Sequence, residues 1–153
     1  ADTKPARRKA TSGETWSDIE KEAMRETARE RKASAKLSPA EERAAGEAEV
    51  RAKMAEMSDH DRAMAERLYA MVSRVAPAFM PRTFYGMPAW SRDGKTVCFF
   101  QPASKFKVRY STFGFQPDAR LDDGTMWAAS FALLELSDAD EARLAALVAK
   151  AAS

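Results

Sequence analysis

The chain has 153 residues, of which 45% are hydrophobic and 31% charged, and its formal net charge is only +2. This length favours one domain with some additional material, and the small net charge gives no global field of the kind that draws proteins to nucleic acid or membranes. The single cysteine, Cys98, excludes an intrachain disulfide and a thiolate metal cluster within one chain. Because it lies in the apolar run 97–100, we interpret it as a buried, unreactive thiol.

The N-terminal residues predict a disordered tail rather than a targeting signal. Residues 1–14 contain four Lys or Arg residues with Pro5 and Gly13 and no large apolar side chain. A secretory signal would need an apolar core that is absent here. The longest uncharged apolar run, Met126–Leu134, is about half the length of a membrane span. We therefore expect a soluble, cytoplasmic protein that does not bind membranes.

Residues 15–46 predict a charged helical extension or linker. A capping pattern at Thr15 opens a helical stretch that continues to about Ala35, with a weak apolar face on which Trp16 would dock. A second helix starts at Ser38, followed by Pro39 at the first helical position. Gly46 is expected to weaken or break this helix. The alternative is that 32–46 form a partly helical linker. In either case the domain proper is expected to span 47–153.

The strongest helix of the sequence begins at Ser58. Its apolar residues recur at steps of three and four, which is the spacing of a helix face that packs on a core; they are Met64, Leu68, Met71, Val72 and Val75. Pro77 is expected to end it.

The following residues predict an antiparallel sheet. The uncharged segment Phe84–Trp90 contains Gly86 and Pro88, which predict an apolar bend between two strands. Asp93-Gly94 is a hairpin turn signal before a strand over 96–101. Further strands are expected over 105–113 and, as a strand or a short helix leading into one, over 126–136. A capped helix from Ser137 closes an α+β fold of four or five antiparallel strands with helices on one face.

The stretch 105–110 alternates basic and apolar residues, which in a strand places Lys105, Lys107 and Arg109 on one face. One interpretation is an ordinary solvated sheet face. The other is a face that binds anions, with an apolar rim supplied by Tyr85, Met87 and Trp90. The alternation also argues against nucleic acid, because single-strand platforms present aromatic and basic residues on the same face.

Signatures of catalysis and of metal binding are missing. The sequence has no Gly-rich phosphate loop, no nucleophile elbow and no pair of His residues for zinc. Asp118, Asp122 and Asp123 are oxygen ligands that a hard cation prefers, but Asp-Asp-Gly is also ordinary turn chemistry. We therefore predict no catalytic residues, no metal ligands and no resident cofactor.

The hexapeptide Tyr85-Gly86-Met87-Pro88-Ala89-Trp90, with a later Lys-containing segment over 103–108, resembles the YdhG-like family of bacterial domains. The resemblance covers about 47–153. It implies a fold similar to frataxin in outline, and some members of that family are labelled iron chaperones. No metal ligand is transferred by the resemblance.

The sequence thus predicts a non-enzymatic binding domain, a monomer or weak dimer, that holds a small anionic ligand or a protein partner on a basic sheet face. The alternative function is iron binding or iron chaperoning of the frataxin type.

Overall fold

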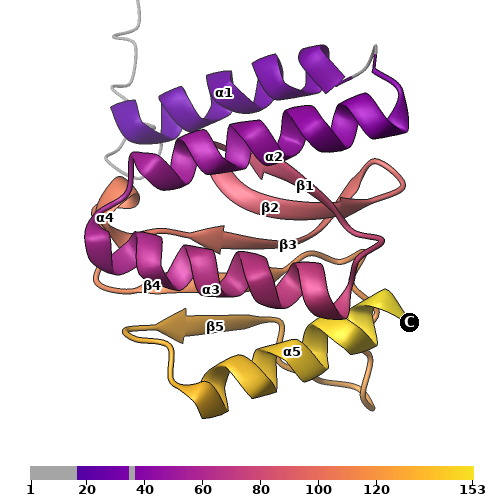
Figure 1. Cartoon of the computed structure of the whole chain (residues 1–153). Helices are drawn as coiled ribbons and strands as arrows, with labels where there is room; N and C mark the ends of the chain where they lie inside the picture. Colours follow the sequence, from indigo (N-terminus) through magenta and orange to yellow (C-terminus); the bar gives the residue numbers. More distant parts are fainter. Residues whose placement is uncertain (1–16, 35–36) are drawn as a thin grey trace, which may run out of the picture.

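The computed structural model describes residues 17–34 and 37–153, so the predicted basic tail 1–14 and Trp16 lie outside the described residues. Five helices and five strands lie within these residues (Figure 1). The helices are α1 (Asp18–Ser34), α2 (Pro39–Ala55), α3 (Asp59–Val75), α4 (Ala103–Phe106) and α5 (Asp138–Ala152). The strands are β1 (Met80–Phe84), β2 (Met87–Arg92), β3 (Lys95–Gln101), β4 (Ser111–Phe115) and β5 (Ser130–Leu133).

The five strands form one antiparallel sheet in the order β1-β2-β3-β4-β5, so each strand pairs with its neighbour in sequence. Two tight turns connect the first three strands. Tyr85 and Gly86 have φ of 52° and 74°, and Asp93 and Gly94 have φ of 51° and 77°. Positive φ at both central residues is what a type I′ hairpin turn requires. The Asp93-Gly94 turn is confirmed, whereas the expected Gly-Met-Pro bend is shorter than predicted, because Met87 already belongs to β2.

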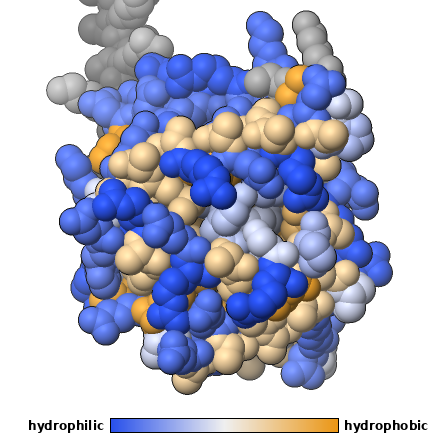
Figure 2. Space-filling model, viewed as in Figure 1, coloured by the Kyte–Doolittle hydropathy of each residue, from blue (hydrophilic) through white to orange (hydrophobic). Residues whose placement is uncertain are grey.

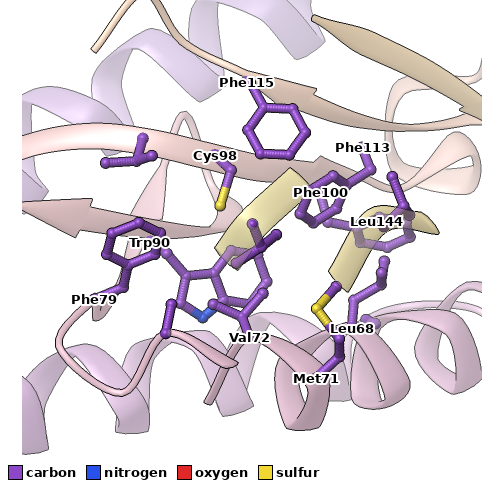
Figure 3. Close-up of a cluster of buried hydrophobic side chains, with 14 of the residues drawn as sticks. Leu68, Met71, Val72, Phe79, Trp90, Cys98, Phe100, Phe113, Phe115 and Leu144 are labelled. Atoms are coloured by element: carbon purple, nitrogen blue, oxygen red, sulfur yellow. The ribbon is translucent and has the colours of Figure 1, made fainter. Parts of the chain in front are cut away.

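The helices pack on one face of the sheet, which confirms the predicted α+β architecture. In Figure 1, α2, α3 and α5 lie in front of the strands. Figure 3 shows the core between them, where Trp90, Cys98 and Phe113 of the sheet face Leu68 and Val72 of α3. Burial raises the pKa of the Cys98 thiol, so this cysteine is the inert core residue that the sequence predicts.

A register irregularity in the pairing of β2 with β3 enlarges this core. Trp90 pairs with Cys98, but Ser91 pairs with Thr96, so Val97 is an additional residue in β3. A β-bulge of this kind lets two consecutive residues contribute to the same face. Val97 and Cys98 accordingly both belong to the buried cluster.

The two core helices α3 and α5 begin at side-chain caps. The Ser58 hydroxyl accepts a hydrogen bond from the Asp61 N–H, and Ser137 and Asp140 form a reciprocal capping box. Arg67 ties the two helices together by donating to the Leu136 carbonyl (2.6 Å) and to the Glu141 carboxylate (2.7 Å). The predicted apolar stripe of α3 is buried from Met64 to Val72.

Gly46 does not break α2, contrary to the prediction. The helix continues through this residue to Ala55, and Gly46 is the point at which α2 lies against β1. A Cβ atom at this position would overlap the carbonyl oxygen of Pro81. Glycine is therefore present for close approach of the helix to the strand rather than for interruption of the helix.

Helix α1 covers the outer edge of β1. Its N-terminus is capped by the Ser17 hydroxyl, which accepts from the Glu20 N–H (3.1 Å). Near its middle, the buried hydroxyl of Thr27 accepts a hydrogen bond from the Tyr85 N–H (2.7 Å). The predicted helical extension is thus packed on the sheet edge, where it satisfies a backbone donor of the β1–β2 turn.

The helix side of the molecule is mainly hydrophilic, with pale hydrophobic atoms scattered among charged side chains (Figure 2). Within 17–34 and 37–153, no helix is long and apolar enough to cross a membrane.

The predicted final strand 126–136 is shorter than expected, because only Ser130–Leu133 pair with β4.

Candidate functional site

The predicted strand over 105–113 is wrong in its first half. Residues 103–106 form the short helix α4, Lys107 ends it in the left-handed conformation with φ of 52°, and pairing as β4 begins only at Ser111. The alternation of basic and apolar residues therefore does not create a basic sheet face. It also no longer separates the aromatic from the basic side chains, so the sequence argument against nucleic acid loses its premise.

A buried carboxylate on α3 explains why the chain turns into α4. Asp61 is 3% exposed, and one of its oxygens accepts from both the N–H (2.9 Å) and the hydroxyl of Ser104. Its other oxygen accepts from the Ser111 hydroxyl (3.2 Å), which in turn accepts from the Ala103 N–H (2.9 Å). Burial alone would raise the pKa of Asp61, but these hydrogen bonds outweigh it and leave the pKa below its ordinary value.

Lys105, the first predicted anion ligand, points inward. Its ammonium group donates to the Gly86 carbonyl (2.9 Å) and lies 3.5 Å from the Glu26 carboxylate. The ammonium group of Lys53 shares the same carboxylate at 3.2 Å. Lys105 thus joins α1, α4 and the β1–β2 turn, and it brings together the two segments on which the family resemblance rests.

Lys107 and Arg109 are exposed, as an anion-binding role requires. With Val108 (46% exposed) and Tyr110 (37% exposed) they form a surface segment, 107–110, which we call the basic loop. The Arg109 guanidinium lies over the Tyr110 ring, 5.2 Å from its centroid. Among the described residues, neither Lys107 nor Arg109 has a carboxylate within ion-pair distance, whereas Lys53, Lys95 and Lys105 each have at least one.

The three residues predicted as an apolar rim lie elsewhere. Trp90 is 1% exposed and packs against Tyr69 and Phe113 in the core (Figure 3). Met87 is 6% exposed, and Tyr85 is half-buried with its ring edge-on to Phe84. The structure therefore does not bring these side chains together with Lys107 and Arg109.

Residues on the helix-free face of the sheet were missed by the sequence reasoning. The register aligns Arg82, Ala89, Phe99, Gly114 and Ser130 in one row across the five strands. At one end of this face, a hollow of about 240 Å³ is lined by side chains that include Arg31, Arg82, Phe84, Lys95, Gln116 and Asp118. The period-two pattern of residues 80–84 and, beyond the bulge, 98–101 carried this signal, because residues two apart share a face.

Of the three acidic residues considered for a cation, Asp118 has an ion-paired carboxylate, and Asp122 has a hydrogen-bonded backbone carbonyl. Asp118 forms an ion pair with Lys95 (3.8 Å), and the backbone carbonyl of Asp122 accepts a hydrogen bond from Lys150 (3.2 Å). Within the described residues, no group of three or more His, Cys, Asp or Glu side chains is arranged to hold a metal ion.

Glu30 provides a test of how α1 is seated on the sheet. Burial raises the pKa of Glu30. The nearby polar groups of Thr83 and Gly86 oppose this shift, and the Glu49 and Glu26 carboxylates add to it. A carboxyl group whose pKa is higher in the folded than in the unfolded state is easier to ionise when the chain unfolds. The free energy of unfolding therefore falls as the pH rises from the unfolded pKa through the folded pKa. We expect Glu30→Gln to stabilise the protein by roughly 0.5 kcal/mol at pH 7.

The measurement is urea denaturation at pH 7 and at pH 4. The gain should shrink at pH 4, where Glu30 itself becomes protonated. The control is Glu22→Gln on the exposed side of α1, which removes contacts to Arg25 and Arg29 and should give no gain at either pH. Equal stabilisation at both pH values would contradict the role of the buried charge.

No protein-family model matches this chain, and no curated protein or solved structure matches it either. The resemblance to the YdhG-like family therefore stays a prediction from the residues at 85–90 and 103–108.

Proposed function

We propose that this domain is a non-enzymatic binding module for an anionic ligand or partner, and that the basic loop 107–110 makes the contact. The observation that carries the proposal is the state of its cations: Lys107 and Arg109 are exposed and lack a carboxylate partner among the described residues. By contrast, seven described Lys and Arg residues lie within ion-pair distance of a carboxylate: Arg25, Arg29, Lys53, Arg62, Arg67, Lys95 and Lys105. Unpaired cations beside an exposed aromatic ring are suited to an anion that also offers a planar or apolar group.

The position of the loop supports this role. Its N-terminal end is fixed through Ser104 to Asp61, and its C-terminal end is fixed through Ser111 to the same carboxylate. A surface segment held at both ends loses little conformational entropy when a ligand binds. The burial of the Cys98 thiol in the core supports a non-enzymatic role.

The alternative, an iron-binding or iron-chaperone function, gains no support from the part of the chain that the structure describes, because no ligand group is assembled there. We therefore propose anion binding alone.

Charge reversal tests the basic loop. We expect Lys107→Glu with Arg109→Glu to weaken binding of inorganic triphosphate at least roughly tenfold, because two charge-assisted contacts become repulsive. Binding is measured by isothermal titration calorimetry at low ionic strength. The control is Lys21→Glu with Arg74→Glu, which makes the same change in net charge at two exposed helix positions. Equal losses in both double variants would show that only net charge matters, and the loop would then not be the site.

A further inference from the structure

Phe99 lies on the helix-free face of the sheet between two small residues. Its directly paired neighbours are Ala89 on β2 and Gly114 on β4. The ring extends sideways over Gly114, where any Cβ atom would overlap its outer carbons. Phe99 is partly exposed, so part of its ring is accessible to solvent. This glycine is thus what permits an aromatic ring to lie across the sheet.

A second aromatic side chain continues this surface. The Phe84 ring lies 6.0 Å from the Phe99 ring, and the Tyr85 ring lies 4.5 Å from the Phe84 ring. In the described part of the chain α2, α3 and α5 cover the opposite face of the sheet (Figure 1), and neither Phe84 nor Phe99 belongs to the buried core there. Aromatic rings that lie on an open sheet are positioned to stack on planar groups.

Cations border the same surface. Arg82 lies in the same cross-strand row as Phe99, two strands away, which is about 10 Å at the usual strand spacing. Its guanidinium donates to the Gly94 carbonyl (3.3 Å) and has no ion-pair partner among the described residues. The adjoining hollow of about 240 Å³ adds Lys95, and its one carboxylate, Asp118, belongs to the Lys95 ion pair. The charge of this surface therefore favours a polyanion.

We propose that the helix-free face of the sheet binds single-stranded nucleic acid, with a base stacked on Phe99 and a backbone phosphate at Arg82. This proposal specifies the class of ligand for the anion binding proposed above. It depends on that proposed function only for the basic loop, which makes a second phosphate contact. An acidic peptide would use the cations but leave the aromatic rings without a planar partner. A nucleotide chain uses both, because each nucleotide carries a base and a phosphate.

The test compares Phe99→Leu with wild type in binding to fluorescein-labelled dT12 and rU12, followed by fluorescence anisotropy at 50 mM salt. Leucine keeps an apolar side chain over Gly114 but removes the stacking ring. We expect roughly tenfold weaker oligonucleotide binding, with triphosphate binding unchanged. Phe131→Leu is the matched control, because Phe131 is a half-buried ring on the helix side of β5. Thermal unfolding of each variant establishes that it is folded.

Arg82→Gln provides a second, independent variant. It should weaken binding to both oligonucleotides and reduce the slope of log affinity against log salt by about 1. A preference for rU12 over dT12 or the reverse distinguishes RNA from DNA as the ligand, and either result supports the proposal.

Several outcomes would overturn it. These are no binding of wild type to either oligonucleotide, no difference between Phe99→Leu and Phe131→Leu, and equal competition by a twelve-residue polyglutamate peptide. A dimer in sedimentation that Phe99→Leu disperses would also overturn it, because the face would then be an interface between two copies. Loss of triphosphate binding only in the charge-reversed loop, with Phe99→Leu binding oligonucleotide normally, would leave the proposed function standing while this inference fails. If instead Phe99→Leu weakens oligonucleotide binding and the charge-reversed loop variant binds triphosphate normally, the sheet site stands and the basic loop is not a binding site.

Discussion

Replacing Gly46 by alanine should destabilise the protein by about 2 kcal/mol or more, although helix propensity alone predicts a gain of about 1 kcal/mol. The physical reason is the contact between α2 and β1. The added Cβ atom would overlap the Pro81 carbonyl oxygen, which is backbone and cannot rotate away as a flexible side chain would. The helix must then lift from the strand, and the burial of Val50 and Met54 beneath it is reduced.

The measurement is the urea midpoint followed by circular dichroism. The control is Ala48→Gly, an exposed position one half-turn further along the same helix. It should cost about 1 kcal/mol through propensity alone. One change replaces glycine by alanine and the other alanine by glycine, so helix propensity alone would give them opposite effects on stability. Destabilisation by both would therefore show close packing at position 46. A higher midpoint for Gly46→Ala would show that α2 does not approach β1 as described.

Asp61→Asn should be the most damaging conservative change near the candidate site, with an expected loss of about 2–3 kcal/mol. The Asp61 carboxylate accepts hydrogen bonds from Ser104 and Ser111 through both of its oxygens. An amide replaces one of these acceptors by a donor, which leaves buried hydroxyl and N–H groups without partners. The change should also release α4 and lower triphosphate binding, because the basic loop loses its anchor.

The pH dependence of this loss has a definite sign. The pKa of Asp61 is lowered on folding, so its contribution to stability is fully present above the ordinary carboxyl pKa near 4. It declines as pH falls through the lowered folded value. The difference between wild type and Asp61→Asn should therefore be constant from about pH 5 to 7 and shrink at lower pH. Glu66→Gln, an exposed change on the same helix, should show no such difference. A loss independent of pH down to pH 2 would contradict the role of the charge.

Much of the fold could be predicted because its signals are local. The α3 stripe, the Asp93-Gly94 turn and the Ser137 cap each depend on residues within a few positions of one another. The strand predicted over 105–113 failed for the opposite reason. Its alternating pattern fits a strand, but the Ser104 backbone is held by Asp61, 43 residues earlier in the chain. The residues near 105–113 in the sequence give no indication of that hydrogen bond.

Gly46 shows the same limit for helices. Local propensity treats glycine as a weak point, whereas the structure uses the missing side chain to admit a strand that follows much later in sequence. For the candidate site, the sequence identified Lys107 and Arg109 correctly as exposed cations. It could not distinguish them from Lys105, because the partners of Lys105 are the Gly86 carbonyl and Glu26, which belong to other elements.

The order of the strands has a consequence for how the chain folds during synthesis. Since every strand pairs with its neighbour in sequence, the sheet can grow one hairpin at a time, although the connection over 116–129 is much longer than the turns at 85–86 and 93–94. The Arg67 contacts to residues 136–141 span about 70 positions and form only when α5 has been made. Until then the apolar side of β3 and β4 lacks part of its cover. We therefore expect chains truncated before residue 137 to aggregate as nascent products, and the last helix to be the step that completes folding.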